Sequence, residues 1–231
     1  MPFDLSVKKI GSYSVLAENQ NWILEENSIA GITDGYLKDL NLDSSESKDH
    51  TLNAFRNICE HWPLSENITG SFSSLVIDKN TDELVLCNDL IGIYPLYYLK
   101  NEDSFYVSNS IILLGILSGC EFDEAGIVQR CLGPEFSNFG SRTILKNCKR
   151  MLPGEWIKFN NKGIKLLTKY DNSLYQNISK PDQKNDLHKD YWNALKNEIK
   201  HCVNNSPEVN IALSGGMDSR IVLGAIPDNK R

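Results

Sequence analysis

The sequence of 231 residues has no long apolar run, and no segment approaches the roughly 20 residues that a membrane-spanning helix needs. Its first ten residues, MPFDLSVKKI, do not have the pattern of a signal peptide. The six cysteines are widely spaced and include no Cys-x-x-Cys pair, which argues against a zinc site and against a disulfide framework. We therefore expect reduced, mostly buried thiols and a cytoplasmic protein.

Clusters of basic residues are also missing. The chain carries 24 Lys and Arg against 30 Asp and Glu, which gives a net charge of −6. The densest basic stretch, residues 146–150, holds only three cations, so no basic face is available to bind the phosphates of a nucleic acid. The hydrophobic fraction of 41% is ordinary for a globular protein.

Residues 1–170 are rich in short segments typical of strands, each bounded by Gly, Pro, Asn or Asp. Residues 50–62 place apolar side chains at spacings of three and four, which predicts an amphipathic helix. Residues 123–133 predict another helix with Asp123 as its N-cap, and the all-apolar residues 109–119 predict a buried one. Grouped strands with helices packed over them predict an α+β sheet sandwich.

The composition becomes polar after residue 170, which predicts a linker over residues 171–186. Residues 187–205 then predict a helix capped by Asp186, residues 207–216 a buried strand, and residues 218–226 a second helix. Helix, strand and helix in this order are the opening of a parallel α/β domain, which we assign to residues 187–231. The apolar face of the first helix is predicted to carry Leu187, Tyr191, Leu195, Ile199 and Cys202.

The turn SGGMDS, residues 214–219, joins the predicted strand to the second helix. Backbone N–H groups converge at such a turn and the helix dipole adds positive potential, which suits an anion. The pattern is neither a Walker A loop nor a dinucleotide fingerprint, because the Lys-Ser/Thr pair and the third glycine are missing. The alternative is an ordinary strand-to-helix turn in which Asp218 is a helix-start residue.

This turn resembles the SGGxDS signature of the PP-loop ATP pyrophosphatases, which split ATP into AMP and pyrophosphate while they adenylate a substrate. The resemblance implies an adenine nucleotide α-hydrolase-like fold for the C-terminal part, with ATP and Mg²⁺ as cofactors. It implies Asp218 as a magnesium ligand. The ATP-binding residues that it implies are Ser214, Gly215, Gly216, Asp218 and Ser219.

Several blocks between residues 30 and 225 resemble, in the same order, the asparagine synthetases and the related β-lactam synthetases. That resemblance implies a class II glutamine amidotransferase-like domain with an N-terminal-nucleophile-hydrolase-like sheet sandwich over residues 1–170. Each block alone has a plain structural interpretation, and Asp89 in particular could simply stabilise a turn. The matching residues are Gly70, Phe72, Asp89, Gly92, Pro95, Leu96, Tyr97, Tyr98, Ser108, Leu113, Leu114 and residues 151–154.

The chain departs from this family where glutamine would be hydrolysed. The family's nucleophile is a cysteine at the mature N-terminus whose α-amino group is the base, whereas this sequence begins MPF and its first cysteine is Cys59. The family's glutamine-binding Asn-Gly-Glu segment is represented by Asp34, Gly35 and a tyrosine, and Asp89 matches the acidic residue for the substrate amine. We expect no catalytic nucleophile, no glutamine hydrolysis and a vestigial glutamine pocket at these three residues.

The resemblance implies an ATP-dependent amide-forming ligase that adenylates a carboxylate, which an amine or ammonia then attacks. The family's later acidic motif and catalytic lysine would lie beyond Arg231, so we expect a fragment that does not complete the reaction alone. The expected partners are a small carboxylate and an amine, with a second copy or another chain supplying the missing synthetase part, and neither nucleic acid nor membrane. The alternative is a non-catalytic amidotransferase-like module for binding or assembly.

Overall fold

A computed structural model of the protein describes residues 5–39, 41–42, 47–60, 68–101, 104–133, 136, 140–160, 162–168, 187–203 and 208–230. Contacts within the chain divide it into two compact units, Met1–Tyr170 and Asp171–Arg231, and each is described by itself. The predicted linker 171–186, together with Asp186, lies outside the described residues.

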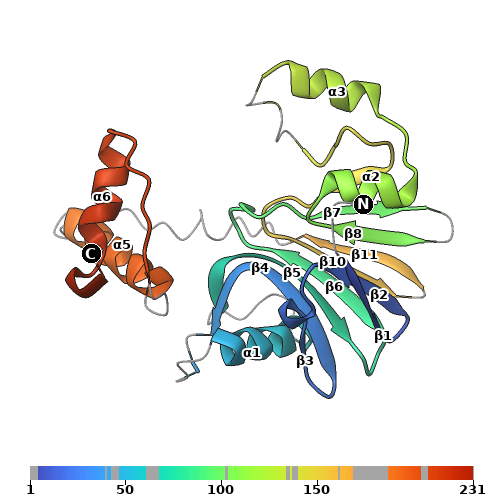
Figure 1. The fold of residues 1–231 in the computed structure, drawn as a ribbon, viewed down its shortest axis with the longest axis horizontal. Helices are drawn as coiled ribbons and strands as arrows, with labels where there is room; N and C mark the ends of the chain where they lie inside the picture. The colour runs from blue at the N-terminus through green and yellow to red at the C-terminus, as the bar shows by residue number, and fades with distance from the viewer. Residues whose placement is uncertain are drawn as a thin grey trace. The chain divides into compact units, whose positions relative to one another are not determined.

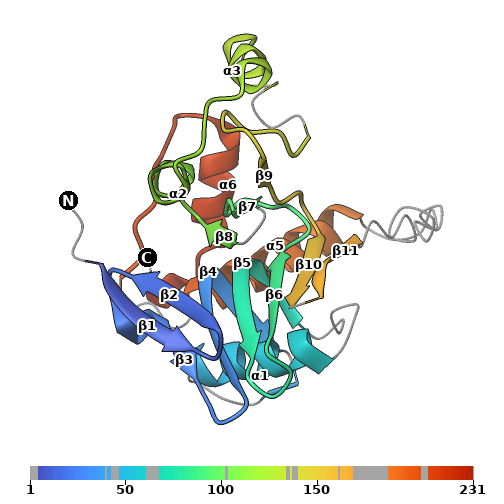
Figure 2. The same ribbon diagram turned by 90° about the vertical axis from the view of Figure 1, so that its right-hand side faces the viewer.

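The largest sheet of the first unit has six antiparallel strands in the order β11-β10-β6-β5-β4-β3. Figure 2 shows β4, β5, β6 and β10 running side by side. The two 11-residue strands β4 and β5 pair over their whole length, from Ile29 opposite Asp78 to Asp39 opposite Ile68. The strands are β3 (Leu24–Glu25), β4 (Ile29–Asp39), β5 (Ile68–Asp78), β6 (Glu83–Asn88), β10 (Glu155–Asn160) and β11 (Gly163–Thr168).

One face of this sheet is covered by the helix α1 (Ser47–Glu60). The predicted amphipathic stripe is confirmed, because Leu52, Phe55 and Ile58 are buried in a cluster with residues of β4, β5, β6 and β10. The ring of Phe55 lies so close to Gly31 that a Cβ there would stand 2.7 Å from its Cε2 atom. A glycine at this position therefore lets the helix approach the sheet.

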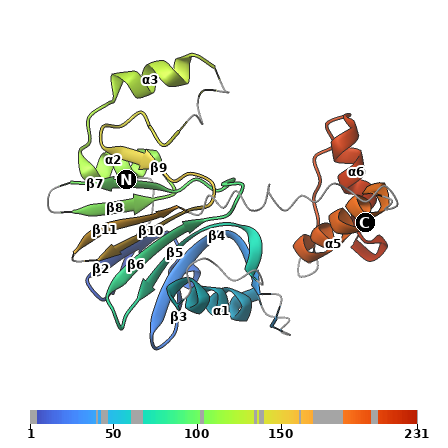
Figure 3. The ribbon, with the colours of Figure 1, turned by 180° about the vertical axis from the view of Figure 1, so that it is seen from behind.

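The opposite face carries a second layer of strands, seen beyond the six-stranded sheet in Figures 1 and 3. Side chains alternate as a pleated strand requires: in β5, Val76 faces α1 and Ile77 faces the second layer. The second layer consists of the hairpin β1 (Ser6–Ile10) and β2 (Tyr13–Ala17), and of the three-stranded sheet β7 (Tyr97–Lys100), β8 (Phe105–Ser108) and β9 (Cys148–Arg150). A short 3₁₀ helix, η1 (Gln20–Trp22), links β2 to β3.

The helix α2 (Ile111–Ser118) packs on the outer side of the three-stranded sheet. Leu114 is buried there against Tyr97 and Leu99. The prediction that this apolar helix is buried all round is wrong, because the side chains of Ile112 and Ile116 are 73% and 63% exposed. With α1 on one side and α2 on the other, the first unit has helix, sheet, sheet and helix layers, which confirms the predicted sheet-rich α+β class.

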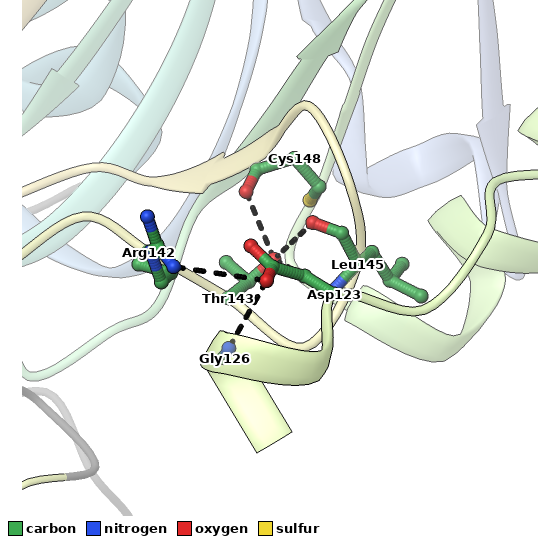
Figure 4. Close-up of polar contacts among 6 residues, drawn as sticks. All are labelled: Asp123, Gly126, Arg142, Thr143, Leu145 and Cys148. Carbon is green, nitrogen blue, oxygen red and sulfur yellow. Dashed lines mark hydrogen bonds and ion pairs between the residues drawn. The ribbon is translucent and has the colours of Figure 1, made fainter. Parts of the chain in front are cut away.

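The helix α3 (Glu124–Cys131) confirms the predicted N-cap, since the Asp123 carboxylate accepts a hydrogen bond from the Gly126 N–H at 3.2 Å. Figure 4 shows how the segment after this helix is held. The buried Thr143 hydroxyl donates to the carbonyl oxygens of Leu145 and Cys148 at 3.2 and 2.9 Å, and accepts the Leu145 N–H. A Cβ at Gly126 would stand 1.9 Å from the Thr143 carbonyl oxygen, so the helix backbone rests directly on this segment.

The second unit contains α5 (Leu187–Val203), α6 (Met217–Ala225) and the 3₁₀ turn η2 (Asp228–Lys230). Both predicted helices are present, but the predicted buried strand is not: residues 208–214 form neither helix nor strand, and Leu213 is 56% exposed. A strand exists only with a hydrogen-bonded neighbour, and none pairs with this segment among the described residues.

The six cysteines, all of which the structure describes, are thiols. Cys87 and Cys148 are buried, Cys59 and Cys120 are half-buried, and Cys131 and Cys202 are exposed, so the prediction that the thiols are mostly buried is wrong. Over the part of the chain that the structure describes, no helix is long and apolar enough to span a membrane.

Candidate functional site

The three residues of the predicted glutamine pocket lie at one end of the six-stranded sheet. Asp34 and Gly35 belong to β4 and stand opposite Ser73 and Phe72 of β5. Asp89 follows β6 on the other side of β5, where its carboxylate accepts the Phe72 N–H at 2.7 Å. The structure therefore brings the three residues together across a single strand.

Asp89 has a structural role that fully engages its carboxylate. Oδ1 accepts the N–H groups of Ile91 and Gly92 at 2.6 and 2.7 Å, and Oδ2 accepts the Phe72 N–H and, at 3.3 Å, the hydroxyl of Ser71. Only 7% of the residue is exposed. Such a carboxylate fixes the turn 89–92 to the start of β5, and this geometry favours the turn-stabilising interpretation over direct contact with a ligand.

This turn also packs against the Met-Leu-Pro-Gly segment, residues 151–154. The Gly154 N–H donates to the Asp89 carbonyl oxygen at 2.7 Å. Gly92 has φ = +65°, a left-handed conformation, and a Cβ there would stand 3.0 Å from Cγ of Pro153. Two sequence blocks about 60 residues apart thus form one structural unit beside the candidate site.

Asp34 and Gly35 are more exposed to solvent than Asp89. Gly35 has φ = +95°, and a Cβ there would meet both the Ser71 carbonyl oxygen at 2.1 Å and the ring of Tyr94 at 2.6 Å. The Asp34 carboxylate accepts one hydrogen bond, from the Asn109 side chain at 3.3 Å. Asp34 is half-buried, which leaves its carboxylate able to meet a ligand.

Three further polar residues that the sequence reasoning missed continue from Asp34 across the sheet. Ser73 of β5 stands opposite Asp34 of β4 on one side and Asn88 of β6 on the other. In β10, Trp156 stands opposite Cys87, so the preceding residue, Glu155, lies beside Asn88. These four residues, Asp34, Ser73, Asn88 and Glu155, are called the polar row. A buried polar residue on each of three adjacent strands, in the middle of β5, at the end of β6 and at the start of β10, is the signal that could have revealed them, but only once the register was known.

The peptide group between Met151 and Leu152 binds two buried residues of the polar row, Asn88 and Glu155. The Asn88 side-chain N–H donates to the Met151 carbonyl oxygen at 3.4 Å, and the Leu152 N–H donates to the Glu155 carboxylate at 2.7 Å. Glu155 is 5% exposed, and this burial raises the pKa of its carboxyl group, partly offset by the Leu152 hydrogen bond and by the charge of Lys149.

The predicted ATP-binding turn of the second unit is compact and exposed. Gly215 has φ = +74°, and Gly216 is the N-cap of α6 without a side-chain cap, which leaves the first N–H groups of the helix open. The hydroxyl groups of Ser214 and Ser219 lie 3.2 Å apart, and the Ser214 N–H donates to the Ser219 hydroxyl at 3.3 Å. Ser214, Ser219 and the two glycines are thus brought together around one helix start.

Asp218 lies in the first turn of α6 and is exposed. Among the described residues, no group of three or more His, Cys, Asp or Glu side chains could hold a metal ion by itself. A groove of about 570 Å³ in the same unit is lined by α5 residues, including Lys196 and Lys200, and by residues 224–228. It lies at the opposite end of α6 from the Ser-Gly-Gly turn and is not part of that turn.

Comparison with known proteins assigns the first unit. Residues 42–171, more than half of the chain, match the family described as glutamine amidotransferase domain. The chain belongs to this glutamine amidotransferase family. The match includes Asp89, the turn that it fixes and the Met-Leu-Pro-Gly segment, and it ends where the first unit ends.

Two curated relatives are similar to the chain at low identity. The glutamine-hydrolyzing asparagine synthetase 2 of Bacillus subtilis (strain 168) is 26% identical over 167 residues, which cover 68% of this chain and 22% of the relative. The amidase chyE of Penicillium rubens is 25% identical over 238 residues, which cover 94% of this chain and 33% of the relative. The chain thus spans between a fifth and a third of the length of these relatives.

Two solved structures are also similar to the chain. The allosteric regulatory enzyme of purine biosynthesis is 16% identical with a TM-score of 0.40, over 90% of this chain and 45% of that one. The glutamine phosphoribosylpyrophosphate amidotransferase from B. subtilis, complexed with ADP and GMP, is 15% identical with a TM-score of 0.38, over 88% of this chain and 46% of that one.

Proposed function

We propose that the chain is part of an ATP-dependent amide-forming ligase of the asparagine synthetase type, in which the amidotransferase unit does not hydrolyse glutamine. The observation that carries this proposal is the SGGMDS turn, whose two glycines and two serines surround the uncapped start of α6. The similarity to an asparagine synthetase over 68% of the chain supports it.

The proposed chemistry places the phosphates of ATP at the start of α6. A substrate carboxylate oxygen attacks the α-phosphorus, the bond to the β-phosphate oxygen breaks, and pyrophosphate leaves. An amine nitrogen then attacks the acyl carbon, AMP leaves, and the amine loses a proton to solvent or a base. The open N–H groups after Gly216 and the hydroxyls of Ser214 and Ser219 suit the charge that develops on the phosphate oxygens.

Mg²⁺ would neutralise part of the phosphate charge in this reaction. It is a hard cation that typically takes one or two carboxylates together with phosphate oxygens and water. The exposed carboxylate of Asp218, with the hydroxyls of Ser214 and Ser219 close to the same helix start, is a donor set of this kind. Asp218 is therefore the residue of this chain that we assign to the metal.

Calorimetric titration of the full chain with Mg-ATP tests the proposal, with Asp218→Ala beside the unchanged protein. Asp190→Ala is the matched control, because Asp190 is also an exposed acid in the first turn of a helix. We expect a dissociation constant on the order of micromolar, lost in Asp218→Ala and retained in Asp190→Ala. Glutamine hydrolysis, assayed as ammonia release, should be undetectable in all three proteins.

Two results would count against this function. Absence of binding heat in the unchanged protein would favour the second candidate, a non-catalytic amidotransferase-like module for binding or assembly. The observations behind that candidate are that the first unit has three hydrophobic clusters of its own and that the Asp89 carboxylate is engaged in fixing a turn. Ammonia release from glutamine would instead contradict the loss of glutaminase activity.

A further inference from the structure

The polar row contains a buried acceptor that no described residue satisfies. Among the residues that the structure describes, the Asn88 side-chain oxygen Oδ1 has no hydrogen-bond partner, and Asn88 is only 3% exposed. A buried polar atom without a partner costs stability and is rare in folded proteins. An unsatisfied oxygen directly after the buried apolar run Leu84–Cys87 therefore points to a bound group that donates a hydrogen bond.

The neighbours of this oxygen are also acceptors. Residues directly opposite each other in an antiparallel sheet place their side chains on the same face, so Asp34, Ser73 and Asn88 share one face. Glu155 shares it too, because Ile157 and Leu86, which alternate with Glu155 and Asn88, lie in one hydrophobic cluster. The row thus offers two carboxyl groups, a hydroxyl and an amide oxygen between the two sheets.

We propose that the polar row binds a small primary amine in its ammonium form, with Asn88 Oδ1 as the central acceptor and Asp34 at the solvent side. An ammonium group carries three N–H donors and a positive charge, which match an acceptor-rich row that contains two carboxyl groups. An oxyanion or a carboxylate would be repelled by the same groups. This site belongs to the first unit and does not depend on ATP binding at residues 214–219.

Methylammonium chloride is the probe, titrated into the full chain while the melting temperature and the carbon-13 signal of the Glu155 carboxyl group are followed. Tetramethylammonium chloride at equal ionic strength carries the same charge but has no N–H donor. We expect a saturable effect of methylammonium with a dissociation constant on the order of 1–10 mM, as befits so small a ligand, and none of tetramethylammonium. The bound cation should also lower the pKa of Glu155.

Three variants and one control locate the site. Asn88→Leu, an apolar replacement within an apolar strand, should weaken methylammonium at least tenfold, whereas Asn88→Asp should strengthen it by adding a carboxylate. Asp82→Asn removes the same charge as Asp34→Asn but lies in the turn before β6, so it should leave binding unchanged while Asp34→Asn weakens it severalfold.

Other outcomes overturn the inference. An equal response to both cations would show an ionic-strength effect only. Unchanged binding in Asn88→Leu would place the amine elsewhere. A more stable Asn88→Leu chain, with no saturable methylammonium effect in the unchanged protein, would mean that Asn88 Oδ1 merely holds a water molecule or the proton of a neutral Glu155. Asp218→Ala should bind methylammonium as the unchanged protein does, which separates this result from the ATP titration.

Discussion

In the unit formed by residues 1–170, apolar side chains are buried on both faces of the six-stranded sheet and under α2. In the unit formed by residues 171–231, the described apolar side chains behave differently. Val203, Ala225 and Ile226 are buried, but Tyr191, Leu213 and Met217 are 68%, 56% and 69% exposed. Apolar side chains such as Ile112 and Ile116 are exposed in the first unit too, but the first unit also contains three hydrophobic clusters. Among the described residues of the second unit, only Val203, Ala225 and Ile226 are buried apolar residues.

The same contrast holds for polar groups. Asp89 is surrounded by four donors and fixes a turn, while Asp218 is exposed at a helix start. A carboxylate that matches a family motif can thus be structural in one unit and available to a ligand in the other, although each was a candidate site residue on sequence grounds. Burial and donor count, rather than residue type, distinguish the two roles.

The largest expected effect is on the core of the first unit. Phe55→Ala removes a fully buried ring from the cluster between α1 and the sheet, and should lower the free energy of unfolding by about 3–5 kcal/mol. Tyr191→Ala removes an exposed ring in α5 and should change it by less than about 0.5 kcal/mol. Urea unfolding, monitored by hydrogen exchange in each unit, measures the change in the free energy of unfolding in both variants. Similar losses in the two variants would mean that α5 packs as tightly as α1.

The stripe that contains Phe55 shows what the sequence could establish. Spacing alone predicted the helix and its buried face, and turn residues predicted most strands of the first unit, because both signals are local. The all-apolar helix α2 was predicted to be buried, yet Ile112 and Ile116 face outward. Which faces are covered depends on the tertiary arrangement, and composition does not encode it.

The candidate sites also differ in whether the sequence could predict them. The Ser-Gly-Gly turn and the meeting of Asp34, Gly35 and Asp89 were within reach of motif reasoning. The polar row was not, because Ser73, Asn88 and Glu155 become neighbours only through strand register, and a shift of one residue would move them to the other face. The predicted strand at residues 207–216 was wrong because a strand depends on a partner that its own residues do not specify.

A smaller effect on stability is expected when the carboxylates of Asp89 and Asp218 are removed. Asp89→Ala leaves the buried N–H groups of Phe72 and Gly92 without their acceptor and should cost about 3 kcal/mol of stability. Asp218→Ala loses only a favourable charge near the helix start and should cost less than about 1 kcal/mol. Thermal and urea unfolding of the two variants measure these two stability costs. A cost for Asp218→Ala as large as for Asp89→Ala would contradict the exposed, available role assigned to Asp218.

The smallest expected effect concerns pH and is confined to the first unit. Burial raises the pKa of Glu155 above its ordinary value, so the folded chain holds this proton more tightly than the unfolded chain does. Its contribution to stability is therefore fully present below the unfolded pKa and is lost as the pH rises through the folded pKa. Glu155→Gln removes this loss while its side-chain oxygen can still accept the Leu152 N–H.

The stability of Glu155→Gln relative to the unchanged protein should therefore increase as the pH rises above the ordinary glutamate pKa of about 4.3. Carboxylates with lowered pKa, such as Glu25 beside Lys79 and Lys8, have the opposite pH dependence but are common to both proteins and cancel in the difference. Asp190→Asn, a change at an exposed acid of α5, is the control for the loss of one carboxyl group. If the stability difference for Glu155→Gln did not vary with pH, the carboxyl group would not be desolvated, and the acceptor-rich character of the polar row would rest on a solvated Glu155.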